Sequence, residues 1–198
     1  MKLIFLNIHL LSLAVALGSM LIAEHLISER VIFARKRPFS VDVYETVLFA
    51  SRAVSVALLL LWLSGVGFVV LGYLDDPGYI ENQKIWAKVS IVLLMSLNGI
   101  YIHRTLLPRL MEVSQGGSLI HDATESATFR LSFAVSIAGW LLAAFYGTAK
   151  FLNQGYQYSE LFGLYLVIVV LLFAFSYLVH PERKAVPPAA AADVETSH

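Results

Sequence analysis

Five long apolar stretches constrain this sequence more than any other feature. They cover residues 3–27, 46–73, 85–107, 129–151 and 159–179. A helix needs roughly 20 mostly apolar residues to cross the hydrocarbon core of a bilayer. Because backbone amides in lipid must bond within their own segment, each stretch is expected to be helical. The pattern predicts an all-α integral membrane bundle of about five transmembrane helices within residues 1–180.

The composition agrees with a membrane protein and excludes several kinds of chemistry. Of the 198 residues, 58% are hydrophobic and 14% are charged, whereas a soluble domain has about 25% charged residues. The 14 basic and 14 acidic residues balance, so nothing indicates nucleic-acid binding. The absence of cysteine removes disulfides, thiolate metal sites and iron–sulfur clusters. The lipid bilayer is therefore the first expected partner.

Basic residues gather in alternate connecting segments. The basic segments contain Arg30, Arg35, Lys36, Arg37, Arg104, Arg109, Arg130, Arg183 and Lys184. Another loop holds Asp75, Asp76, Glu81 and Lys84. Because Lys and Arg favour the cytoplasmic side, we expect an inner (plasma) membrane protein with its N-terminus outside and its C-terminus in the cytoplasm. The tail over 181–198 is expected to be disordered and cytoplasmic.

Small and weakly polar residues follow one face of two predicted helices. The face of the first helix has His9, Ser12, Ala16, Ser19 and Ala23, and that of the fourth has Ser132, Ser136, Gly139, Ala143 and Gly147. Such stripes are typical of close helix packing in lipid, within one bundle, in a homo-oligomer or in a larger complex. The fifth stretch is almost purely aliphatic and aromatic, so we expect it at the edge of the bundle. Trp86 and Tyr165 suit interfacial depth.

Ionisable residues within the apolar stretches are the first candidates for function, because burying them in lipid is costly. They are His9, Glu24, His25, Arg52, Lys88 and His103. At about 1.5 Å per residue, His9 and Lys88 lie toward the outer helix ends and the other four toward the inner ends. His9 and His25 are about 24 Å apart on one helix, so they cannot ligate the same metal ion.

This arrangement predicts haem b as a cofactor. His25 and His103 lie at similar depth on different helices, and a b-type haem takes one axial ligand from each side. The candidate metal ligands are His9, His25 and His103, and the sequence leaves open which two form a pair. Arg52 and Arg104 could contact the propionates, Asn98 the cofactor, and Lys88 the cofactor or substrate.

Structural roles compete with each of these assignments. The histidines could be packed and hydrogen-bonded, and Lys88 could extend to the outer surface. Arg52 could pair with Glu24 or Glu45, and Arg104 could meet an anionic lipid headgroup. Met95 is typical of helix packing, and Asn98 with Gly99 indicates a close helix contact.

Two motifs carry a resemblance to known membrane proteins. The motif of the first helix begins with Ile8-His9-Leu10-Leu11-Ser12 and ends at Gly18. The motif of the third helix is Trp86-Ala87-Lys88, followed by Asn98-Gly99 and His103. Over about 130 residues this resembles a group that includes the membrane HemJ type of protoporphyrinogen oxidase, the copper-resistance D domain and uncharacterised relatives. The resemblance implies that His9 and Lys88 serve haem binding and activity. The chain has Trp86 where the oxidase type has a histidine.

Three functions remain open from the sequence, and so does the question of whether the chain is an enzyme. The first is a haem b protein in electron transfer or porphyrin oxidation. The second is a metal-handling protein of the copper-resistance kind, with Met20, Met95 and the histidines as ligands. The third is a non-catalytic accessory subunit of a larger membrane complex.

Overall fold

The structure is all-helical over the residues that it describes. The computed structural model describes residues 2–27, 40–115, 123–153 and 155–179. Its long helices are α1 (Lys2–Ile27), α2 (Val41–Asp75), α3 (Gln83–Tyr101), α5 (Ala123–Thr148) and α6 (Tyr158–Val179). Five helical spans, with α3 continued to Glu112, are long and apolar enough to cross a membrane. The predicted fold class is confirmed, and the tail over 181–198 lies outside the described residues.

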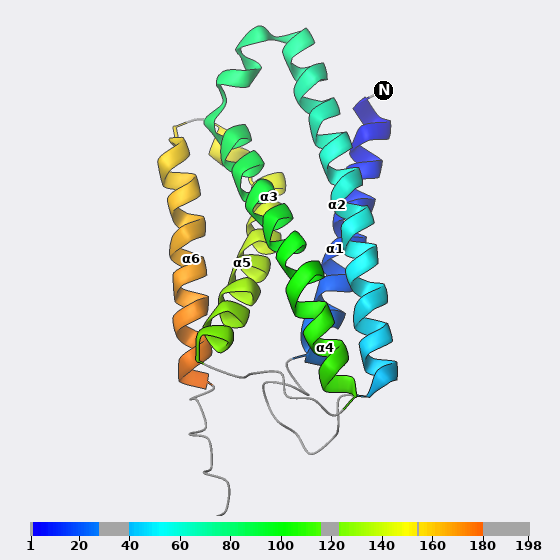
Figure 1. The fold of residues 1–198 in the computed structure, drawn as a ribbon. Coiled ribbons are helices and arrows are strands. Elements are labelled where there is room, and N and C mark those ends of the chain that lie inside the picture. Colours follow the sequence, from blue (N-terminus) through cyan, green and yellow to red (C-terminus); the bar gives the residue numbers. More distant parts are fainter. Residues whose placement is uncertain (1, 28–39, 116–122, 154, 180–198) are drawn as a thin grey trace, which may run out of the picture.

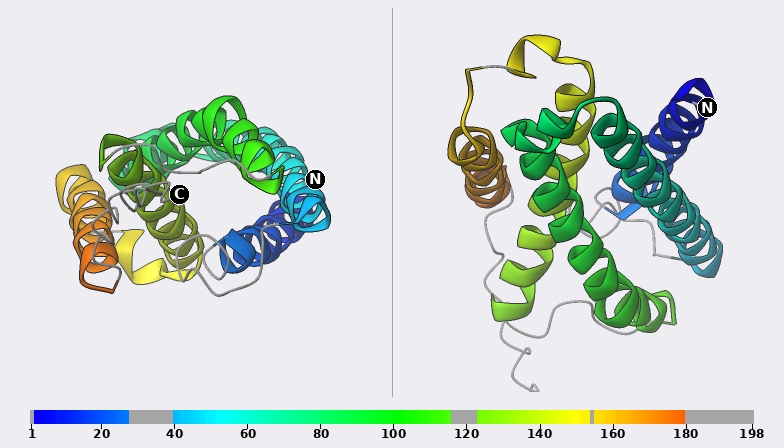
Figure 2. Two further views of the ribbon diagram at one scale, coloured as in Figure 1. Left: turned by 60° about the horizontal axis from the view of Figure 1, so that its bottom comes forward. Right: turned by 90° about the horizontal axis from the view of Figure 1, so that it is seen from above.

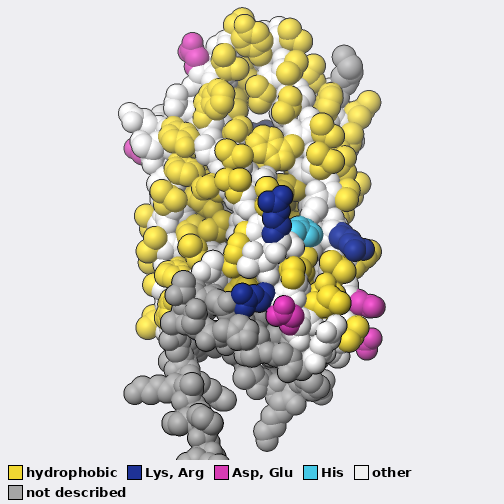
Figure 3. Space-filling view, viewed as in Figure 1, with side chains coloured by type: hydrophobic (Ala, Val, Ile, Leu, Met, Phe, Trp, Pro, Cys, Tyr) yellow, Lys and Arg dark blue, Asp and Glu magenta, His cyan; other side chains and the backbone are white. Residues whose placement is uncertain are grey.

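The surface of the bundle requires a lipid solvent. In the most apolar 18-residue stretch of α1, of α2 and of α6, only 17% is buried inside the protein. The largest buried share is 39%, in α5. The remaining apolar side chains cover the outside, and Figure 3 shows them over most of one face. An apolar surface of this extent is unfavourable in water and favourable in hydrocarbon. The chain is a multi-pass membrane protein.

The helices run alternately up and down between two ends (Figure 1). The His9 end holds the start of α1, the end of α2 and the start of α3. The His103 end holds the end of α1, the start of α2, the helix α4 (Leu107–Ser114) and the start of α5. Arg104, Arg109 and Arg130 belong to the half of the bundle nearer the His103 end, while the basic segments 30–37 and 183–184 lie outside the described residues.

Local polar groups set where the helices begin and end. Asp76 is extended between α2 and the 3-10 turn Pro77–Glu81, and its carboxylate accepts a hydrogen bond from the Gly78 amide. The Asn82 side chain accepts from the Lys84 amide at 3.0 Å and caps the start of α3. These caps satisfy amides that the helix cannot bond itself. A second 3-10 turn, Lys150–Asn153, follows α5.

The bundle consists of a hairpin and a three-helix group. α1 packs along α2, while α3, α5 and α6 pack on one another. Figure 2 shows the hairpin on one side of the bundle and α6 on the other, with α3 and α5 between them. As expected, α6 lies at the edge, because it packs only on α3 and α5 among the long helices. Tyr165 is 1% exposed and belongs to the core of the bundle, and its interfacial depth stays a prediction.

The small-residue stripes face the interior, as expected. Ser12 and Ala16 are buried on α1, and Ser132 is buried on α5. A Cβ atom added to Gly139 would lie 2.5 Å from atoms of the Met95 side chain. Met95 thus packs directly against the α5 backbone, which is the helix-packing role expected from the sequence.

Candidate functional site

The His9 imidazole is held by a serine on the neighbouring helix. His9 Nδ1 lies 2.8 Å from Ser64 Oγ, and the Ser64 hydroxyl donates its one hydrogen to the Leu60 carbonyl at 2.6 Å. When the Ser64 hydroxyl donates to this carbonyl, it accepts the hydrogen on His9 Nδ1. In that tautomer the neutral ring has its lone pair on Nε2. The edge of the ring meets Phe68, with ring centroids 5.6 Å apart.

Lys88 lies on α3 at the same end of the bundle as His9. Lys88 is half-buried and forms no hydrogen bond or ion pair with the described residues. The two residues that the sequence motifs pair are therefore at the same end of the bundle. This end combines an imidazole with a lysine that has no partner among the described residues.

Lys84 is an unexpected buried cation at the same end. Its side chain is 4% exposed, and its Nζ donates to the Ala149 carbonyl at 2.6 Å. The sequence placed Lys84 in a polar loop, but Asn82 caps α3 so that the helix begins two residues earlier than expected and includes Lys84. Ala149 offers its carbonyl because α5 ends at Thr148.

The His103 imidazole repeats the serine arrangement nine residues earlier on α2. Its Nε2 lies 2.8 Å from Ser55 Oγ, and the Ser55 hydroxyl donates to the Ser51 carbonyl at 2.9 Å. In this arrangement His103 donates from Nε2 and has its lone pair on Nδ1. Unlike His9, His103 is exposed.

A single π-helical turn over Ile102–Leu106 presents His103. Pro108 explains this turn, because proline has no amide hydrogen and its ring would clash with the carbonyl four residues earlier, that of Arg104. The wider turn lets the Leu107 amide bond to the Ile102 carbonyl instead. Such turns are frequent at functional sites.

A small cavity lies beside His103, between the hairpin and the α3–α5 pair. Its volume is about 90 Å³, and its polar lining includes Glu24, His103, Ser51 and Ser136. Glu24 is half-buried, and no described residue forms a hydrogen bond or ion pair with it. The cavity also meets Met20 and Met95, so it gathers one carboxylate, one imidazole and two thioethers.

The three candidate histidines do not form one centre. Ser64 and Ser55 are nine residues apart on α2 and thus about 14 Å apart along its axis. Since each holds one ring at 2.8 Å, His9 and His103 cannot be the two axial ligands of one haem. His25 is exposed in the last turn of α1 and is not part of the cavity lining. Within the described ranges, no group of three His, Cys, Asp or Glu side chains could hold a metal ion.

Asn98 joins two helices. Its Nδ2 donates to the Ser132 carbonyl at 3.0 Å and to Ser136 Oγ at 3.2 Å, and its Oδ1 accepts from the Ser132 hydroxyl at 2.8 Å. Both amide hydrogens are used, so none is left to donate to a cofactor. This geometry matches the close helix contact, and the cofactor contact of Asn98 stays a prediction.

A larger cavity of about 410 Å³ lies between α3, α5 and α6. Asn98, Tyr101, Thr128, Ser132 and Tyr165 supply its polar lining, and the rest is aliphatic. No histidine and no charged side chain lines it. This cavity therefore offers no iron ligand among the described residues that form it.

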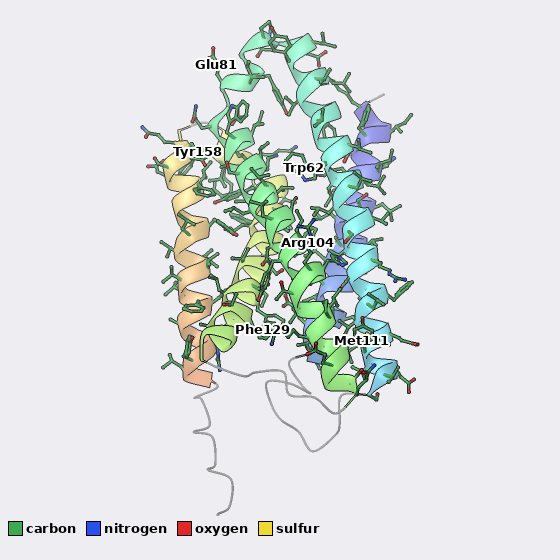
Figure 4. The ribbon with its side chains drawn as sticks, viewed as in Figure 1. Trp62, Glu81, Arg104, Met111, Phe129 and Tyr158 are labelled. Atoms are coloured by element: carbon green, nitrogen blue, oxygen red, sulfur yellow. The ribbon has the colours of Figure 1, made fainter. Side chains whose placement is uncertain are left out.

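The two candidate arginines remain on the outside of the bundle. Arg52 and Arg104 are exposed, and neither forms an ion pair or hydrogen bond with another described residue. The alternative pairing of Arg52 with Glu24 or Glu45 is thus not seen. Figure 4 labels Arg104 near the π-turn, below Trp62, whose indole nitrogen donates to Ser96 Oγ at 3.0 Å and joins α2 to α3.

The class of the protein follows from the fold: a five-helix membrane bundle in which two serines of α2 each hold a histidine. Comparison of the chain with known protein families, with curated proteins and with solved structures found no match. The resemblance drawn from the sequence motifs therefore stays a prediction.

Proposed function

We propose that the chain is a haem b-binding membrane protein, with His9 as an axial ligand. One observation carries the proposal: His9 Nδ1 lies 2.8 Å from Ser64 Oγ, whose hydroxyl has the Leu60 carbonyl as an acceptor. In the tautomer with the hydrogen on Nδ1, Nε2 is able to bind iron, and metal-ligating histidines are usually oriented in this way through the other ring nitrogen. Lys88, at the same end of the bundle, would supply a positive charge for a propionate.

The donor set fits a haem, and the cavities limit where it would bind. The cavity beside His103 has a volume of about 90 Å³, well below the roughly 300–1,000 Å³ of pockets that bury ligands of drug size. The larger cavity has no iron ligand. The haem would therefore bind beside His9, where the hairpin packs mainly on itself. There it would supply one-electron chemistry, for electron transfer or porphyrin oxidation.

The test is the visible absorption spectrum of the full chain purified from haem-replete cells. The proposal expects a Soret band, or its appearance when hemin is added. His9→Ala should remove the band, and the matched variant His25→Ala should keep it. A colourless wild-type protein that also fails to shift the hemin spectrum would overturn the proposal.

Metal handling is a second candidate, favoured by the cavity at the other end. Met20, Met95 and His103 line that cavity together with Glu24, and thioethers with imidazole suit copper(I). Metal analysis of tag-free protein tests this candidate. Copper bound to the wild type and lost from Met20→Leu and from His103→Gln would support it. Retention of copper by both variants would place the metal elsewhere.

The sidedness of the bundle belongs to the same proposal. The His103 end, with Arg104, Arg109 and Arg130, would face the cytoplasm of a plasma membrane. Reporter fusions after Ser114 and after Gly78 would test this assignment. The first should report cytoplasm and the second the exterior, and the reverse pattern would overturn the orientation.

A further inference from the structure

Arg52 on α2 and Arg104 in the π-turn are exposed and have no ion pair or hydrogen bond with any described residue. Both arginines lie within helical spans that are long and apolar enough to cross a membrane. A charged side chain in such a span is costly unless an anion or water compensates it. The described residues therefore supply no counterion for these two positive charges.

The hydrogen bond between His103 and Ser55 holds these arginines at one level of the bundle. Arg104 follows His103 directly, and Arg52 precedes Ser55 by three residues, which places it on the same general face of α2. Since the imidazole nitrogen and the hydroxyl are 2.8 Å apart, the two arginines flank the contact between α2 and the π-turn. Figure 3 shows cationic side chains around one histidine in the lower half of the molecular face that it draws.

The nearby carboxylates do not neutralise this cluster. Glu45 lies seven residues before Arg52 and Glu112 eight residues after Arg104, so each is about 10 to 12 Å farther along its helix. Glu24 lines the internal cavity, whereas the two arginines are exposed. No carboxylate of the described residues therefore completes the cluster.

We propose that Arg52 and Arg104 form a site for the phosphate of an anionic phospholipid, beside the bond between His103 and Ser55. The surrounding helix faces favour a lipid over a free anion, because exposed apolar side chains such as Val56 and Leu59 continue along α2 next to the site and can contact acyl chains. Guanidinium groups match phosphate through paired hydrogen bonds. The site is independent of the proposed haem.

Native mass spectrometry of the full chain with added phosphatidylglycerol or phosphatidylcholine tests this site. Wild-type protein should retain phosphatidylglycerol preferentially. At about 1 kcal/mol for each cation near the phosphate, Arg52→Gln and Arg104→Gln should each weaken retention about fivefold, and the double variant roughly thirtyfold. The double lysine variant should keep the preference for the anionic lipid.

The matched control is Arg130→Gln. Arg130 already donates to the Ser176 carbonyl and covers the Tyr177 ring, so its loss should leave lipid retention unchanged. Equal retention of the two lipids by wild type, or unchanged retention in the double glutamine variant, would overturn the proposal. Displacement of phosphatidylglycerol by inorganic phosphate would show a free-anion site and would also overturn it.

Discussion

Two serines in the middle of α2 each hold a histidine in the same way but in different surroundings. Ser64 and Ser55 each lie 2.8 Å from an imidazole nitrogen and have a backbone carbonyl of α2 as an acceptor. Toward the His9 end the ring is half-buried, and Lys88 lies at the same end of the bundle. Toward the His103 end the ring is exposed and lines a cavity with Glu24, which has no hydrogen bond or ion pair with the described residues.

This difference indicates what each end can bind. An imidazole lone pair beside an uncompensated lysine suits a metal complex that carries acidic groups, such as a haem with propionates. At the His103 end an acidic side chain lines the cavity inside the bundle, and the arginines lie outside it. The inner surface there suits a cation or water, and the outer surface suits a phosphate.

The largest expected effect tests whether the two histidines differ in function. His9→Ala should abolish haem binding, because it removes the proposed axial ligand, while His103→Ala should leave binding unchanged. The measurement is the Soret absorbance per protein after hemin titration. If His103→Ala lost the band and His9→Ala kept it, His103 and not His9 would be the axial ligand.

The second prediction concerns the serines. Ser64→Ala removes the group that orients His9, and loss of such an outer partner costs about 10- to 100-fold in metal affinity. Hemin affinity should therefore fall by that factor, while Ser55→Ala should have no effect on it. Ser64→Thr, which keeps the hydroxyl, should restore most of the affinity. Equal affinities of the alanine variant and the wild type would show that Ser64 only packs.

The sequence was sufficient for the fold because the bilayer imposes a simple rule on it. Each stretch of about 20 apolar residues had to be a helix, and the structure has the five expected helices. Their ends were less predictable. Asn82 starts α3 before Lys84, and α5 ends at Thr148 rather than at residue 151, because local capping decides such boundaries.

The site was predicted only in part, since the partners of its residues come from other helices. The motifs singled out His9 and Lys88, but nothing in the spacing of Ser55 and Ser64 indicated that each would hold a histidine. Asn98 bonds to two serines of α5, a pairing that depends on helix order and rotation. Pro108 could have indicated the π-turn, because it removes a helical hydrogen bond next to His103.

The third prediction separates the cations at the two ends. Lys88→Gln should weaken hemin binding about fivefold, the loss expected from one solvent-accessible charge contact of about 1 kcal/mol with a propionate. Arg104→Gln should not change hemin affinity. Titration with hemin dimethyl ester, which has no free carboxylate, provides the control, because wild type and Lys88→Gln should bind it equally. A loss of ester binding in the variant would assign Lys88 a structural role.

The smallest expected effect is on stability, at the His103 end. Ser55→Ala removes the bond that joins α2 to the π-turn, and side-chain hydrogen bonds between membrane helices contribute about 0.6 kcal/mol on average. The free energy of unfolding in mixed micelles should fall by about that amount. His103→Ala should produce a similar loss, and the double variant should lose little more, because both changes remove the same bond. Additive losses would mean that His103 and Ser55 stabilise the bundle through separate contacts, and that the bond between them does not hold the π-turn against α2.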